Sequence, residues 1–147
     1  MEKVLTQRTI HWQAAAASCQ GALEKARELG IAVSALVMDR GGNVVASLRD
    51  PATPFHTYAI ASDKATTAAG FGIPTSQWWG YIESMNSPSV KAALPAAHRF
   101  AILGGGVPMY DGADLIGGIG VSGGTEEQDE ACARAGLAAS GLAAVPG

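Results

Sequence analysis

The sequence is poor in charge and in cysteine. Charged residues make up 16% of its 147 residues, and the formal net charge is -3. No run of lysine or arginine occurs, so the chain lacks the basic footprint of a nucleic-acid-binding protein, and we expect no nucleic-acid partner. Its two cysteines, Cys19 and Cys132, do not form a disulfide framework, which favours a reduced, cytoplasmic setting.

Long apolar runs are also missing. No segment approaches the roughly 18 consecutive apolar residues of a membrane span, so we expect no membrane partner. The run of alanines from Ala14 to Ala17 is too short for the core of a signal peptide. With 48% hydrophobic residues, the chain has a globular composition, and its length predicts a single domain over residues 1–147.

Most local signatures of catalysis and cofactor binding are absent. The sequence has no C-x-x-C-H, no H-E-x-x-H, no paired C-x-x-C, no P-loop and no G-x-S-x-G. We therefore predict no metal site. One familiar pattern does occur, because Gly118 to Gly123 spell G-x-G-x-x-G, the fingerprint of dinucleotide-binding proteins.

This glycine motif lacks the context that dinucleotide binding requires. The fingerprint belongs to a parallel βαβ unit with an acidic residue about 20 positions further on a second strand. Only residues 124–147 follow it here, and they are typical of one helix. Glu126, Glu127 and Asp129 at the start of that helix would repel a pyrophosphate. We predict no NAD, FAD or ATP binding, and interpret the glycines as positions where another backbone or a ligand comes close.

Apolar periodicity and turn residues predict the order α-β-β-α-(α)-β-β-β-α. Because most strands come as hairpins, the sheet is predicted to be antiparallel and covered by helices. Between residues 85 and 97 the pattern favours no element. The predicted helices are residues 6–29, residues 57–69, a short helix from 75 and a last helix from the capping box at Thr125. The predicted strands are Ile31–Met38, Val44–Arg49, Phe100–Leu103, Val107–Tyr110 and Leu115–Val121.

Three segments together resemble the GlcG/HbpS family, also called the haem-degrading domain family. They are DRGGNVVASLRD (39–50), SDKATTAAGFGIPT (62–75) and the long stretch from Gly104 to Ala139 that contains IGVSGGTEEQDE. The resemblance covers nearly the whole chain. It implies an α+β fold of profilin-like type, with three α/β/α layers around a five-stranded antiparallel sheet. It also implies a small-molecule ligand, with haem as the candidate cofactor, and a homo-oligomer.

His56 is the sharpest single candidate for chemistry. It lies at the start of the second predicted helix, where the helix dipole opposes a positive charge on the imidazole. A neutral imidazole can act as a base or as an iron ligand. Ile60 and Lys64 follow at two successive spacings of four, which places all three on one helical face. A surface histidine near a helix end is the plainer interpretation. His98 and His11 are weaker candidates.

Several other side chains could line a site. Arg49 ends a strand and could clamp a ligand carboxylate, although a surface strand-end arginine is equally consistent. Trp78 and Trp79 diverge by about 100° on a helix, so one of them is expected to line a pocket or a subunit contact. A lysine on a helix surface is the usual case for Lys64. The candidate ligand-binding residues are Arg49, Phe55, Tyr58, Lys64, Trp78 and Trp79.

Three functions remain open at this point. The first is a small-ligand-binding protein of the GlcG/HbpS type, with haem as the implied ligand. The second is a cofactor-independent lyase, isomerase or hydratase with catalytic residues His56, Glu83 and Asp63 in an aromatic pocket. The third is a structural or assembly protein. We predict that His56 and Arg49 share one pocket with Trp78 or Trp79.

Overall fold

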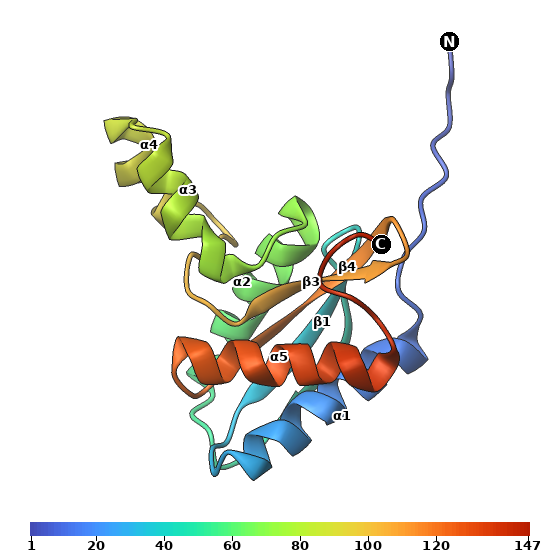
Figure 1. Ribbon diagram of the computed structural model, residues 1–147, viewed down its shortest axis with the longest axis vertical. Coiled ribbons are helices and arrows are strands. Elements are labelled where there is room, and N and C mark those ends of the chain that lie inside the picture. Colours follow the sequence, from blue (N-terminus) through green and yellow to red (C-terminus); the bar gives the residue numbers. More distant parts are fainter.

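The fold has three layers. The computed structural model describes all residues from 1 to 147. One sheet lies between α2 on one face and α1 with α5 on the other (Figure 1). The α+β architecture in three layers is therefore confirmed. The elements are α1 (Trp12–Glu28), β1 (Ser34–Asp39), β2 (Val44–Arg49), α2 (His56–Phe71), α3 (Trp78–Ser84), α4 (Pro88–Ala93), β3 (Gly106–Asp111), β4 (Asp114–Ser122) and α5 (Glu126–Ser140), with short 3₁₀ helices at Thr75–Gln77 and Leu94–Ala96.

The sheet has four strands in the order β2-β1-β4-β3, and every pairing is antiparallel. The antiparallel sheet is confirmed, but the predicted fifth strand at Phe100–Leu103 is wrong. Side chains satisfy the backbone there in place of a neighbouring strand: Ala101 donates its N–H to the Thr67 hydroxyl, and the carbonyl of Leu103 accepts from Thr75. Gly104 and the glycines after it then lead the chain into β3.

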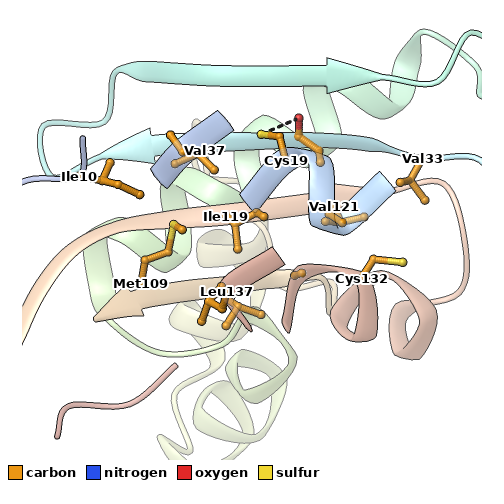
Figure 2. Packing of buried hydrophobic residues seen from close by; sticks show 14 of the residues in the cluster. Ile10, Cys19, Val33, Val37, Met109, Ile119, Val121, Cys132 and Leu137 are labelled. Atoms are coloured by element: carbon orange, nitrogen blue, oxygen red, sulfur yellow. Dashed lines mark hydrogen bonds between the residues drawn. The ribbon is translucent and has the colours of Figure 1, made fainter. Parts of the chain in front are cut away.

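The core lies on both faces of the sheet. Alternate residues of the strands contribute to a large cluster under α1 and α5, drawn in Figure 2, where Val37 and Ile119 lie between the helices and the strands. A smaller cluster on the other face joins Leu36 and Met38 to the alanines of α2. Cys19 and Cys132 are both free and both belong to the larger cluster. No helix is long and apolar enough to cross a membrane.

Glycines of β4 let α2 lie directly on the sheet. A Cβ at Gly118 would come within 2.6 Å of the Ala65 carbonyl oxygen, and one at Gly120 would overlap the Ala61 carbonyl oxygen. The G-x-G-x-x-G pattern is thus a packing motif in which another backbone comes close, as predicted. At its end, Thr125 caps α5 with the full capping box, also as predicted.

The first helix begins later than predicted. Residues 6–11 are not helical, and α1 starts at Trp12 with His11 as the N-cap residue, whose Nδ1 accepts from the Gln13 amide. Ile10 is buried in the core, and its amide donates to Ile116 of β4. Pairing with the sheet therefore overrides the helical pattern in this segment.

Candidate functional site

His56 is exposed at the first residue of α2. Its imidazole stacks on the Phe55 ring at a centroid distance of 4.1 Å. Phe55 is itself 73% exposed, and Ile60, one turn further along the same side of the helix, is 38% exposed. We call Phe55, His56 and Ile60 the His56 patch. It combines an accessible imidazole with apolar surface that the chain itself does not cover.

Arg49 lies at the same end of α2 as His56. Its guanidinium donates to the Thr53 carbonyl at 3.0 Å, and the Thr53 hydroxyl lies 3.4 Å from that of Thr57 in the first turn of the helix. Thr57 also bonds Ser34 of β1 at 2.8 Å. These hydrogen bonds tie the loop between β2 and α2 to β1 and to the first turn of α2, so Arg49 lies near the helix end that carries His56. The arginine remains exposed and can pair with an anion.

Tyr58 and Asp63 flank the patch differently. Tyr58, 42% exposed, follows His56 by two positions and so faces about 160° away from it around the helix. Asp63 lies two turns along α2 on the same side as His56 and is half-buried. The third catalytic candidate, Glu83, is on α3, where its carboxylate pairs with Lys91 at 2.8 Å. The three candidate catalytic residues do not form one cluster.

Lys64 is buried, contrary to the expectation of a surface lysine. Its ammonium donates to the Asp129 carboxylate and to the Val121 carbonyl, both at 2.9 Å, and both charged side chains are 3% exposed. Asp129 also accepts from the Gly124 amide. The pair ties α2 to the start of α5 across β4. Lys64 is therefore a structural residue in this chain and is not accessible to a ligand.

Burial dominates the electrostatics of this pair. Desolvation raises the pKa of the Asp129 carboxyl above its ordinary value, while Lys64 and the amides of Gly124 and Gly123 lower it. The sequence carried a signal that could have revealed the pair. Lys64 lies three residues after Ala61 and one before Ala65, within the stripe that faces the sheet, and a charge on a buried stripe needs a partner.

The two adjacent tryptophans differ in burial, in keeping with their divergence on the helix. Trp78 is 7% exposed and packs edge-on against Phe71 and Phe100, at centroid distances of 4.8 Å for each. Its indole N–H is buried without a hydrogen-bond partner. Trp79 is 47% exposed, and Lys91 lies over its ring at 5.9 Å. One tryptophan belongs to an aromatic cluster and its neighbour is left uncovered.

The structure does not bring the tryptophans to His56 within one chain. Trp78 contacts Phe71, the last residue of α2, whereas His56 is the first. A helix of this length places its two ends about 22 Å apart. Arg49 and His56 thus share one end of α2 and the aromatic cluster occupies the other.

Comparison with known proteins identifies the family over most of the chain. Residues 10–138 match the family model described as haem degrading protein HbpS-like. The chain belongs to the HbpS-like family. It is 34% identical to protein GlcG of Escherichia coli K12 over 118 residues, covering 80% of this chain and 84% of GlcG. An uncharacterised 15.0 kDa protein of Citrobacter freundii is 32% identical over 129 residues, covering 88% and 90% of the two chains.

Solved structures of this family share the fold. The Klebsiella pneumoniae protein ORFY superimposes with a TM-score of 0.87 at 31% identity, covering 96% of this chain and 97% of its own. The PduOC:heme complex superimposes with a TM-score of 0.81 at 24% identity, covering 93% and 99% of the two chains, and demonstrates the shared fold alone.

Proposed function

We propose that this HbpS-like protein binds a small ligand and that the ligand is haem. The observation that supports the proposal is the His56 patch, in which an exposed imidazole stacks on an exposed phenylalanine. An imidazole nitrogen is a common axial ligand of haem iron, and haem also needs apolar surface against its ring. The description of the family as haem degrading supports the same ligand class.

The residues around His56 fit the chemistry of haem. Phe55 and Ile60 offer apolar contact to a porphyrin face, and His56 offers the nitrogen donor. Arg49 lies at the same end of α2 with guanidinium N–H groups free to pair with carboxylates. When bound, haem would supply an iron centre. The chain's own residues would bind it, orient its carboxylates and shield one face from water.

Titration with haemin tests this function. We expect the wild-type protein to shift the Soret band with a saturable, stoichiometric response, and His56→Ala to lose that shift. His11→Ala is the matched control, because His11 is also exposed but lies at the start of α1, on the face of the sheet opposite to α2. Binding that is absent in the wild-type protein, or equal in both variants, would contradict the proposal.

The geometry supports an acid–base enzyme less well. Glu83 is on α3 and pairs with Lys91 of α4. Because α3 follows the C-terminal end of α2 and His56 is at the N-terminal end, the two side chains cannot act on one substrate atom in a single chain. Asp63 is on the same side of α2 as His56 but two turns away. A binding role needs only His56 and its apolar neighbours.

A further inference from the structure

A row of three polar side chains crosses one end of the sheet. Arg49 ends β2, Ser34 begins β1 and Ser122 ends β4, and Ser34 is the register partner of both others. Because directly opposite residues of neighbouring strands point to the same face, all three side chains lie on the face that α2 covers. The next residues of β1 on that face, Leu36 and Met38, are apolar and belong to the core. The polar row is therefore confined to the end of the sheet.

Two threonines cover this row from above. The hydroxyl of Thr57, in the first turn of α2, lies 2.8 Å from that of Ser34, and the hydroxyl of Thr53 lies 3.4 Å from that of Thr57. A Cβ at Gly123 would come within 3.1 Å of the Thr53 hydroxyl, so Thr53 lies against the residue that follows Ser122. The polar row is thus at the N-terminal end of α2, the end that carries His56.

Ser122 differs from the other hydroxyls because it has no partner. It is 6% exposed, and its hydroxyl makes no hydrogen bond within the chain, whereas those of Ser34, Thr53 and Thr57 do. The Trp78 indole N–H is the one buried polar side-chain atom that is both enclosed and unpartnered, so the Ser122 hydroxyl keeps some contact with solvent. Buried polar groups normally find a partner, and this hydroxyl can donate to an atom that approaches from outside.

Arg49 supplies a positive charge that the chain does not neutralise. One guanidinium N–H donates to the Thr53 carbonyl at 3.0 Å, and Arg49 forms no ion pair with an acidic side chain. The adjacent Asp50 carboxylate accepts from the Ala52 amide at 2.9 Å, within its own turn. The remaining guanidinium N–H groups require an acceptor, and a carboxylate is the acceptor that they bind most strongly.

We propose that Ser122 and Arg49 form a carboxylate subsite, in which the Ser122 hydroxyl donates to a ligand carboxylate that Arg49 neutralises. Two strand spacings separate the two Cα atoms by about 10 Å, a gap that an arginine side chain and a carboxylate together span. The choice of haem as the ligand rests on the proposed function: the subsite would hold one of its carboxylates while His56 faces the iron. Ser122 then selects ligands that carry a carboxylate at the rim of a flat ring.

Two porphyrins separate the carboxylates from the iron. Metal-free protoporphyrin IX keeps the carboxylates and lacks the iron, whereas iron etioporphyrin keeps the iron and lacks the carboxylates. We expect Ser122→Ala to weaken the binding of haemin and of protoporphyrin IX about tenfold, and to leave the binding of iron etioporphyrin unchanged. Absorbance and fluorescence titrations measure these affinities. Ser84→Ala, which removes a hydroxyl in α3, is the control and should bind all three as the wild type does.

Arg49→Gln, at an exposed position, should give the same pattern and tests the subsite without altering a buried residue. An equal loss for all three porphyrins, or no loss for any, would overturn the subsite. Haemin binding that needs His56 but ignores both Ser122→Ala and Arg49→Gln would also overturn it and leave the haem function standing. A Soret band that is indifferent to His56→Ala, with protoporphyrin IX binding that depends on Ser122 and Arg49, would overturn the haem function and support the subsite.

Discussion

The contact of α2 with β4 and the segment that follows α2 are packed in opposite ways. Where α2 lies on β4, the sheet has no room for one carbon atom beyond Gly118 or Gly120. Beyond its C-terminus, residues 75–98 form a projection that contains α3 and α4, which we call the arm, and this arm leaves Trp79 and Tyr81 nearly half exposed. The smallest side chains of this protein therefore lie in its densest region, and some of the largest lie in its most open one.

The ion pairs of the two regions give the largest expected difference. We expect Lys64→Met to destabilise the protein by about 3–5 kcal/mol, because it leaves the Asp129 carboxylate buried without its partner. Lys91→Met breaks the pair with Glu83, whose side chains are 51% and 46% exposed, and should cost less than about 1 kcal/mol. Urea unfolding of both variants measures the difference.

The pH dependence of Lys64→Met has a definite sign. Burial raises the pKa of Asp129, and the variant loses the ammonium that lowers it. A carboxyl whose folded pKa lies above its unfolded value favours the folded state at low pH, and that gain is lost as pH rises through the folded pKa. The variant should therefore regain stability as the solution is acidified from neutral pH. A variant whose stability does not rise on acidification would show that Asp129 is not the cause.

Glycine substitutions sharpen the same comparison at a smaller magnitude. Gly120→Ala forces a methyl group into the Ala61 carbonyl and should cost at least about 1–3 kcal/mol. Gly80, in α3 of the arm, has no atom within 4 Å of the place that an alanine methyl group would occupy, so Gly80→Ala should stabilise the helix by about 0.5–1 kcal/mol. Thermal unfolding checks both. Equal effects would mean that the two regions are packed alike.

The anchoring of the arm can be weakened at one hydroxyl. Thr75→Val keeps the shape of the side chain but leaves the buried Gly106 amide without its acceptor, and should cost about 1–3 kcal/mol. Ser84→Ala, which removes an exposed hydroxyl in α3, is the control with an effect near zero. We also expect faster hydrogen exchange at the Gly106 amide in Thr75→Val, because that amide loses its acceptor. Unchanged exchange there would mean that Thr75 does not hold the base of the arm.

Sequence patterns predicted the fold wherever a local rule decided the structure. The capping box at Thr125, the hairpin around Asp39, whose carboxylate accepts from the Gly41 amide, and the glycine packing of β4 all follow from local chemistry. The strand predicted at Phe100–Leu103 failed because Thr67 and Thr75, distant in sequence, satisfy its backbone. A short apolar run does not reveal which partner its backbone will find.

The site was less predictable than the fold. Arg49 and His56 are joined by a short loop, so their common end of α2 could be inferred from connectivity. The Lys64–Asp129 pair spans 65 residues, and no periodicity links its members. The direction of the arm could not be predicted from the sequence either, because it depends on hydrogen bonds that the side chains of Thr75 and Arg99 make at the base of the arm.

The smallest expected effect on folding, and the most informative, belongs to the outer surface of the arm. Trp79→Ser removes a side chain that is 47% exposed, so the stability of the single domain should change by no more than about 0.5 kcal/mol. If the arm packs on a second copy, the same substitution removes a buried aromatic anchor from that contact, and such residues dominate interface energies.

Sedimentation velocity of the wild-type protein should then reveal an oligomer that dissociates in Trp79→Ser. Trp12→Ser, at the 62% exposed tryptophan on α1, should leave it intact. A variant that unfolds at the wild-type urea midpoint yet sediments as a smaller species would separate assembly from folding. Identical sedimentation of Trp79→Ser and wild type would mean that the arm's exposed ring contributes nothing to assembly.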